Sequence, residues 1–316
     1  MGAGYPEFLV VKAYEFFTKL FETVSPQLII LWNQFYALHK IIASVADEQK
    51  ISVKYLEFGN LPGTFAIDSM GQMGESYPAV HYELFHDMPV SDADMEQAET
   101  VWSYLQESRL NRNIQADNNE LEGVKKKLNP QKSVIFYAGQ LDYEAGISPY
   151  TENAARFHSP SFASSDEAAL FLGELARKND WELIYKPHPA VKNRQRSFPA
   201  NVHVIRDCDI NDLIDLSDVT VTILSQTGYI AAIRKKPVVM LGYTQLRGKG
   251  CTYEAFSKSQ VEDSLRAALC YGMTQQMCNE FKRHIAQLCK YYLFDDNLRR
   301  SIRYGRDIND YSIDEL

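Results

Sequence analysis

The second half of the chain alternates short apolar runs with segments of helical pattern, and this alternation restricts the fold more than any other feature. The apolar runs occupy residues 133–137, 181–185, 202–205, 219–224 and 237–241. Helical patterns fall between them at residues 165–179, 210–216 and 229–234. Short buried strands that alternate with helices assemble into a parallel sheet covered on both faces. The second half is therefore predicted to be a Rossmann-like α/β domain.

One β-α-β unit is predicted in the first half. It comprises a strand at residues 28–32, a helix at 34–48 and a second strand at 53–57, joined by a right-handed parallel crossover. The Gly- and Pro-rich segment 58–73 follows the second strand. Open α/β sheets bind ligands at the carboxyl ends of their strands, so we expect a binding loop there. The segment 80–85 has a strand-like pattern.

Length and composition indicate a globular protein of about two domains. The chain has 316 residues, of which 45 % are hydrophobic, enough for two cores at roughly 150 residues per domain. The polar and charged segment 111–132 is the expected linker. We accordingly place an N-terminal α/β domain, with this linker, at residues 1–130 and a C-terminal domain with closing helices at residues 131–316.

Charge and cysteine usage exclude several classes of protein. The net charge of −8 lacks the basic footprint of a nucleic-acid-binding protein, so no nucleic acid partner is expected. The five cysteines are scattered without a CxxC pair, which favours reduced thiols in a cytosolic protein. Charged residues interrupt the aromatic segment 1–30, which resembles neither a membrane span nor a signal peptide. We therefore expect a soluble, cytoplasmic protein.

A basic segment near the C-terminus permits two interpretations. Residues 281–306 contain seven lysines and arginines against two aspartates, namely Lys282, Arg283, Lys290, Arg299, Arg300, Arg303 and Arg306 against Asp295 and Asp296. The simpler interpretation is a solvated helix face. The alternative is peripheral contact with an anionic membrane surface, which would place the protein at the inner face of the membrane.

Polar residues follow two of the buried strands and could bind a phosphate. His188 lies between two prolines, after Lys186, and has little backbone freedom. Ser225, Gln226, Thr227 and Gly228 follow the run 219–224 and begin a helical segment. Hydroxyl groups and free N–H groups at such a helix start suit an anion. Together the two segments predict a nucleotide phosphate pocket in an open α/β sheet.

Each of these residues also has a structural interpretation. His188 could be tied to a neighbouring carbonyl group, Lys186 could be solvated, and Ser225 could be an ordinary helix cap. If the site binds a phosphate, Lys186 neutralises its charge and Gly228 allows close approach of the backbone. Gln140, after the run 133–137, could contact a base or sugar or belong to a plain β–α turn.

Two carboxylates of the first half could take part in catalysis. Glu57 ends the strand at 53–57 and could act as a general base or as a nucleophile. It could equally cap a loop or pair with a surface lysine. Asp68 precedes Gly71 and suits a turn residue better than a catalytic one.

Several common motifs are missing from the sequence. There is no GxGxxG or Walker A loop and no GxSxG elbow, so dinucleotide binding, ATP-driven phosphoryl transfer and esterase chemistry lack their usual marks. His81, His86 and Asp87 lack the spacing of a helical metal site and are interpreted as surface residues. We expect neither a metal nor a cofactor.

In this order, the segments described above resemble the capsule polysaccharide synthesis glycosyltransferases. That family includes Kdo transferases and is related to bacterial sialyltransferases with a His-Pro motif. The similar segments lie between about residues 28 and 255, at 29–33, 56–64, Asp68, Gly71, 139–140, 186–189, 225–228, 236–243 and 248–252.

The resemblance implies a GT-B-like architecture, in which two Rossmann-like domains face each other across a cleft. Fewer residues precede Leu28 than a full acceptor domain needs, so we expect a trimmed N-terminal domain. The implied donor is a nucleotide sugar, CMP-linked and acidic, such as Kdo or sialic acid. The implied donor-binding residues are Gln140, Lys186, His188, Ser225, Gln226, Thr227 and Gly228.

On the acceptor side, the resemblance implies a glycan or glycolipid of a capsule or lipopolysaccharide. Glu57 would be the catalytic carboxylate, assisted by His188, and catalysis would need no metal. The implied acceptor-side residues are Asn33, Gly59, Pro62, Gly63, Thr64 and Asp68. Inverting and retaining mechanisms both stay open.

Two alternatives remain. Teichoic-acid-type transferases of a CDP-alcohol share a Lys-Pro-His-Pro-like segment, but Ser225-Gln226 stands here where they usually carry Ser-Ser. The other alternative is a non-catalytic polysaccharide assembly subunit that keeps the nucleotide-binding fold. Gln226-Thr227 also differs from many relatives, which show a second Ser or Thr before a small residue.

Overall fold

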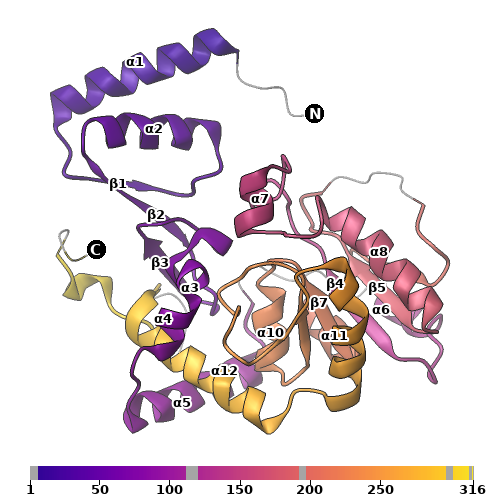
Figure 1. Cartoon of the computed structure of the whole chain (residues 1–316). Helices are drawn as coiled ribbons and strands as arrows, with labels where there is room; N and C mark the ends of the chain where they lie inside the picture. Colours follow the sequence, from indigo (N-terminus) through magenta and orange to yellow (C-terminus); the bar gives the residue numbers. More distant parts are fainter. Residues whose placement is uncertain (1–5, 112–119, 192–196, 297–301, 313–314, 316) are drawn as a thin grey trace.

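The computed structural model describes residues 6–111, 120–191, 197–296, 302–312 and 315. Two sheets organise this part of the chain, one of four strands and one of six. The smaller sheet is built mostly from the first half of the chain and the larger from the second half (Figure 1).

The four-stranded sheet has the order β1-β2-β3-β10. Its first elements are α1 (Glu7–Val24), β1 (Leu28–Leu31), α2 (Ala37–Glu48), β2 (Ser52–Phe58) and β3 (Thr64–Asp68). Strands β1 and β2 are parallel, which confirms the predicted β-α-β unit. Helix α2 lies between the sheet and α1 (Figure 1), and Val45 and Ala46 of α2 pack against Phe21 of α1.

Two predictions for the first half are wrong. The expected loop 58–73 contains β3, which returns antiparallel to β2 because Gly63, at φ 81°, permits a tight reversal. The segment 80–85, predicted as a strand, lies in two short helices, α3 (Tyr77–Val80) and α4 (Tyr82–Asp87). Pro78 fits the first turn of α3. The 3₁₀-helix η1 (Met73–Glu75) precedes them.

The six-stranded sheet is parallel throughout, in the order β6-β5-β4-β7-β8-β9. Its strands are β4 (Val134–Ala138), β5 (Glu182–Lys186), β6 (Val202–Val204), β7 (Val219–Thr222), β8 (Val238–Met240) and β9 (Tyr253–Glu254). This is the doubly wound order, in which the direction of strand addition along the sheet reverses between β4 and β7. The Rossmann-like second half predicted from the sequence is confirmed.

Helices cover both faces of the six-stranded sheet. They are α8 (Ser165–Lys178), α9 (Ile210–Leu216), α10 (Thr227–Ile233) and α11 (Lys258–Tyr271), whereas the short helix α7 (Glu152–Phe157) lies in the connection between β4 and α8. The central strands are buried on both faces because alternate side chains enter two different cores. Phe136 and Ile184 enter one core, whereas Tyr137 and Tyr185 enter the other.

The chain crosses between the two sheets more than once. Helix α5 (Asp92–Ser108) precedes the expected linker, but it packs beside α12 (Gln275–Gln287) and α10 (Figure 1). The indole N–H of its Trp102 donates to the carbonyl oxygen of Ile233 at 2.7 Å. Within the linker, α6 (Leu121–Lys125) is helical. The boundary at residue 130 stays a prediction, because the packing of α5 ties the first half to the second.

The C-terminal segment returns to the first sheet. After α12, a π-helix (Leu288–Tyr292) leads into β10 (Leu293–Asp295), which pairs antiparallel with β3. The 3₁₀-helix η3 (Ile308–Asp310) lies near the end. The first sheet is therefore completed by residues from the other end of the chain.

Most described cations of the basic segment 281–306 have partners within the protein. Lys282 pairs with Glu99 at 3.1 Å and Lys290 with Asp94 at 2.7 Å. The Arg306 guanidinium lies 4.0 Å from the ring centroid of Phe294. Arg299 and Arg300 lie outside the described residues. In the described part of the chain, every helix is too short or too polar to cross a bilayer.

Gly74 marks a point where the two halves of the chain touch through their backbones. A Cβ at this position would lie 1.6 Å from the carbonyl oxygen of Phe157 and 2.7 Å from that of Tyr243. Both carbonyl oxygens belong to the backbone around the six-stranded sheet, so neither can move aside without disturbing the packing there.

We predict that Gly74→Ala destabilises the protein by about 1–3 kcal/mol, because the added methyl overpacks this contact. Urea unfolding monitored by circular dichroism measures the change. Gly123→Ala is the matched control, since nothing lies within 4 Å of its added Cβ in α6. The control should be neutral or stabilise by about 0.4–1 kcal/mol, and equal stabilities of the two variants would contradict the prediction.

Candidate active site

Two adjoining cavities lie where the two sheets face each other. The larger has a volume of about 500 Å³ and the smaller about 70 Å³. They share the lining residues Met73, Glu144, Leu224, Ser225 and Gln226. The shared residues form a junction, so a molecule in one cavity can meet a molecule in the other.

The larger cavity is built from the carboxyl ends of four neighbouring strands. Its walls include segments that follow or end β4, β5, β6 and β7, at residues 138–141, 186–189, 206–208 and 224–227. This is the edge where a doubly wound sheet opens a crevice, beside the reversal between β4 and β7. The structure thereby brings Gln140, Lys186, His188, Ser225, Gln226 and Thr227 to the wall of one cavity.

Lys186 and His188 are held in defined positions in this wall. The Lys186 side chain is 7 % exposed, and its ammonium donates to the carbonyl oxygen of Arg206. Burial lowers the pKa of Lys186 because a charged group loses its hydration there. The Nδ1 atom of His188 accepts the N–H of Ala190 at 3.2 Å. A neutral His188 ring therefore carries its proton on Nε2.

The loop before α10 presents hydroxyl groups rather than free N–H groups. The Ser225 and Thr227 hydroxyl oxygens lie 2.9 Å apart. The Thr227 N–H donates to Ser225 Oγ at 3.3 Å, and the Gly228 N–H donates to the Ser225 carbonyl oxygen at 3.1 Å. The expectation that these N–H groups are free for an anion is therefore wrong, because the loop satisfies them itself.

Gly228 serves the packing of α10 on the sheet. A Cβ there would lie 3.3 Å from Thr222 Cγ2 and 3.4 Å from Met240 Sδ. Gly228 does not line either cavity. Its backbone approaches side chains of β7 and β8, and not the cavity that was expected to hold a ligand.

Gln140 joins the two strands at the reversal. Its side-chain oxygen accepts the N–H of Leu224 at 2.8 Å. Its buried Nε2 has no hydrogen-bond partner within the described chain. The amide oxygen thus links the segments after β4 and β7 at the crevice. The amide N–H₂ group is a donor that could bind a ligand after a small movement of the side chain.

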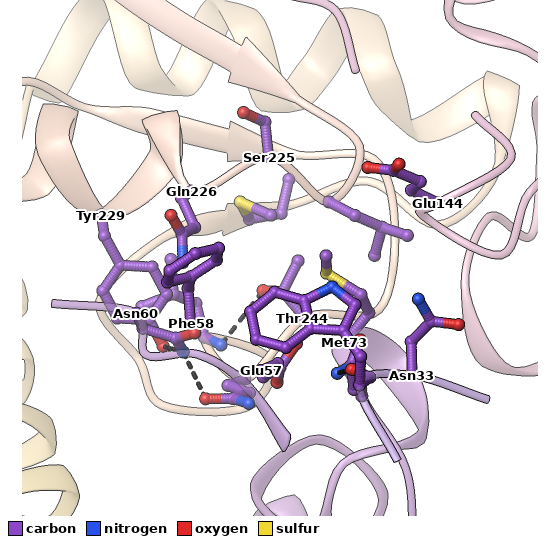
Figure 2. A pocket seen from close by; sticks show the side chains of 16 residues that line it. Asn33, Glu57, Phe58, Asn60, Met73, Glu144, Ser225, Gln226, Tyr229 and Thr244 are labelled. Atoms are coloured by element: carbon purple, nitrogen blue, oxygen red, sulfur yellow. Dashed lines mark hydrogen bonds between the residues drawn. The ribbon is translucent and has the colours of Figure 1, made fainter. Parts of the chain in front are cut away.

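The smaller cavity contains the predicted carboxylate Glu57. Glu57 is the residue before the last one of β2 and is 7 % exposed. Figure 2 shows Glu57, Asn33 and Asn60 on the side of the first sheet, opposite Ser225 and Gln226. Asn33 also accepts the N–H groups of Phe35 and Tyr36 at 2.9 and 3.1 Å, which caps the approach to α2.

Hydrogen bonds across the smaller cavity hold the two sheets together. Asn60 donates to the Tyr229 hydroxyl at 2.8 Å and also to the Gln245 side chain. The Tyr229 hydroxyl in turn donates to Nε2 of His284 at 2.9 Å. Gln226 donates to the carbonyl oxygen of Gly59 at 2.6 Å. The wall of the cavity is therefore a fixed structure.

Asp68 supports the site from outside the cavities. It is buried and accepts the N–H groups of Met70 and Tyr77, each at 2.7 Å, and the hydroxyl of Tyr292 at 2.9 Å. Burial raises its pKa, against the lowering effect of these bonds. This arrangement favours the turn role over a direct role in binding.

The other acceptor-side residues form the turn between β2 and β3. Gly59, Pro62, Gly63 and Thr64 do not line either cavity. The Thr64 hydroxyl donates to the carbonyl oxygen of Leu61 at 2.6 Å, and Tyr304 donates to that of Pro62. Their contribution is to hold Glu57 and Asn60 in place.

Sequence reasoning missed three charged residues of the cavity walls, including Asp207, which lines the larger cavity. Glu144 lies in the segment after β4 and lines both cavities, and Arg206 follows β6 and lines the larger one. The Tyr36 hydroxyl donates to Glu144 at 2.8 Å, and this bond raises the pKa of Tyr36 to about 12. The strand-end rule applied to the strand predicted at 202–205 would have found Arg206 and Asp207, and a longer segment after Gln140 would have included Glu144.

Comparison with known proteins identifies the family. The family model described as "Capsule polysaccharide biosynthesis protein" matches residues 81–285. The chain therefore belongs to the capsule polysaccharide biosynthesis family, as the resemblance of its motifs indicated. No curated protein matches the sequence.

Two similar structures are transferase domains of KpsC from Thermosulfurimonas dismutans. The β-Kdo 2,7-transferase is 16 % identical, with a TM-score of 0.56 over 92 % of this chain and 89 % of that one. The β-Kdo 2,4-transferase is 15 % identical, with a TM-score of 0.56 over 81 % and 78 %. The chain thus has the fold of these transferases, and the predicted GT-B-like class is confirmed.

No group of three or more His, Cys, Asp and Glu side chains that could hold a metal ion occurs among the described residues. His86 lies 3.9 Å from Glu280 in a half-exposed pair. His81 packs against the ring of Tyr77 at 5.0 Å.

We predict that His284 makes the protein sensitive to acid. Burial, followed by the nearby charge of Lys249, lowers the pKa of His284 well below 6.5. The folded state then binds fewer protons than the unfolded state below about pH 6.5, so stability falls by about 1.4 kcal/mol per pH unit from this group.

His284→Gln removes this dependence. The difference in unfolding free energy between wild type and variant should favour wild type at pH 7.5 and shrink steadily toward pH 5, measured by urea unfolding at each pH. Parallel stability curves for the two proteins would contradict the prediction.

Proposed function

We propose that the chain is a glycosyltransferase that moves an acidic sugar from a CMP-linked donor to a bacterial surface glycan or glycolipid. The observation that carries this proposal is the joined pair of cavities. Lys186, His188 and Arg206 line the larger one together with Asp207, and two other carboxylates, Glu57 and Glu144, line the smaller one or the junction. Such an arrangement suits an anionic donor and an acceptor that must lose a proton.

The larger cavity supports an anionic donor. Lys186, His188 and Arg206 lie in its wall, and a CMP-linked acidic sugar carries two negative groups, a phosphodiester and a carboxylate. The volume of about 500 Å³ falls within the usual range of small-molecule sites. As the sugar departs, negative charge develops on the CMP phosphate, and the Lys186 ammonium, the His188 Nε2–H and the Ser225 hydroxyl stabilise it.

The two carboxylates suit the two parts of a retaining reaction. Glu144 lines both cavities, so it can reach the anomeric carbon at the junction, whereas Glu57 lines only the smaller cavity. In the first step a Glu144 oxygen bonds to the anomeric carbon while the bond to the CMP phosphate breaks. In the second step an acceptor oxygen replaces Glu144, and Glu57 takes the hydroxyl proton. Catalysis in this scheme uses no metal.

We predict different losses in two isosteric variants. Glu144→Gln should lower turnover roughly 10³-fold, because an amide is a poor nucleophile. Glu57→Gln should lower it by about 10²–10⁴-fold through loss of the base. Glu152→Gln, exposed at the start of α7, is the control.

Mass spectrometry measures transfer, and calorimetry checks that CMP affinity is unchanged. Near-normal turnover of Glu144→Gln together with an inverted product would replace this mechanism by single displacement on Glu57. Near-normal turnover of Glu57→Gln would remove Glu57 from catalysis.

We predict that CMP raises the melting temperature more than UMP, GMP or AMP does. Lys186→Met should weaken CMP binding by about 10- to 100-fold, since a hydrogen bond to a charged group is worth about 1.5–3 kcal/mol. Lys132→Met is the matched control, because Lys132 precedes β4 at the opposite edge of the sheet and pairs with Asp180.

A donor panel then tests the activity. Transfer from CMP-Kdo or CMP-sialic acid supports the proposal, whereas UDP-sugars should be inactive. Transfer of an alcohol phosphate from CDP-glycerol would instead establish the teichoic-acid-type reaction. CMP binding without transfer or donor hydrolysis would indicate a non-catalytic assembly subunit.

A further inference from the structure

The two cavities differ in the charged groups that line them. Among the described residues that line the smaller cavity, the only charged side chains are Glu57 and Glu144. The larger cavity has cations in its wall as well, Lys186 and Arg206, beside His188, Asp207 and the shared Glu144. An anionic group that entered the smaller cavity would meet two carboxylates without a compensating cation, which is unfavourable at short range.

The remaining polar groups of the smaller cavity are neutral. They are side-chain amides and hydroxyls from both halves of the chain, namely Asn33, Asn60, Gln72, Gln226, Gln245, Ser225, Tyr229 and Thr244. Amides and hydroxyls both donate and accept hydrogen bonds, as the hydroxyl groups of a sugar do. The polar lining therefore matches an uncharged, hydroxylated molecule.

An aromatic pair forms part of the lining. Trp32 directly follows β1, and Phe58 ends the neighbouring strand β2. Their ring centroids are 4.8 Å apart at an interplanar angle of 80°. The two residues are 43 % and 44 % exposed, so each side chain presents apolar surface to solvent.

Aromatic rings at the opening of a polar cavity have a specific use. A pyranose ring has an apolar face of C–H groups and a polar rim of hydroxyls, so it can cover an aromatic ring while its rim stays hydrated. The smaller cavity, at about 70 Å³, admits only the reacting edge of a sugar. The rest of that sugar must lie outside, and the aromatic pair is the surface available there.

We propose that the acceptor is a glycan with a neutral terminal sugar, which stacks on Trp32 and Phe58 and directs one hydroxyl toward Glu57. Acceptors that end in a carboxylate- or phosphate-bearing residue are disfavoured. This inference rests on the proposed function, because it assigns the smaller cavity to the acceptor.

The experiment compares matched acceptors that differ in one charged group. Glucoside and glucuronide, and galactoside and galacturonide, are attached to one fluorescent aglycone, and their binding to the CMP-saturated wild-type protein is measured by calorimetry. We expect at least one neutral glycoside to bind tenfold or more tightly than its acidic counterpart. Equal affinities, tighter binding of the acidic member, or no binding of any glycoside would overturn the charge argument.

Variants test the aromatic pair. Trp32→Ala and Phe58→Ala should each weaken binding of the neutral glycoside about tenfold and raise its KM, with CMP affinity and melting temperature unchanged. Trp32→Phe should restore part of the loss. Tyr271→Ala, at the exposed end of α11, is the control and should have no effect. Unchanged glycoside affinity in Trp32→Ala and Phe58→Ala would overturn the stacking argument.

The same protein samples separate this inference from the proposed function. Hydrolysis of a CMP-linked sugar by water requires only the larger cavity and the carboxylates. Selective binding of a neutral glycoside without donor hydrolysis would leave this inference standing and defeat the proposed transferase. Donor hydrolysis without selective glycoside binding would support the proposed function and overturn this inference.

Discussion

The site depends on the direct pairing of β4 with β7. These strands are neighbours in the sheet although two other strands separate them in the sequence, so the connections that leave their carboxyl ends run to opposite sides. The backbone opens between them, and Gln140 crosses the opening to accept the Leu224 N–H. The segments that form the walls of the larger cavity follow these two strands and their neighbours. Residues as far apart in the sequence as Gly139 and Gln226 therefore line one cavity.

The second constraint is the contact between the two halves of the chain. Asn60 of the first half donates to the Gln245 side chain, Gln226 of the second half donates to the Gly59 carbonyl oxygen, and Glu75 pairs with His158. These bonds bring Glu57 beside the segment after β7. Glu57 and the cations of the larger cavity are therefore held by the same set of contacts, and the chemistry proposed for them needs only small movements.

Much of the second half could be predicted from the sequence, because parallel strands buried on both faces appear as continuous apolar runs. Strand β3 was missed because the Gly and Pro residues around it suggest a loop, and β10 because it is short and pairs with a segment distant in the sequence. His188 and Ser225 were recognisable from the prolines and hydroxyls around them. Glu144 and Arg206 lie in segments of ordinary composition, and Trp32 and Phe58 gain their meaning only from pairing across adjacent strands, so their roles depend on the fold.

Strand β10 has a consequence for how the protein matures. Residues Leu293–Asp295 supply the edge next to β3, so β3 has an unpaired side until these residues have been synthesised, more than 200 residues after β3 itself. During that interval the nascent first sheet exposes backbone N–H and C=O groups that other chains could join. The first sheet therefore closes only after the six-stranded sheet has been synthesised, and a chain cut before residue 293 keeps an open edge along β3.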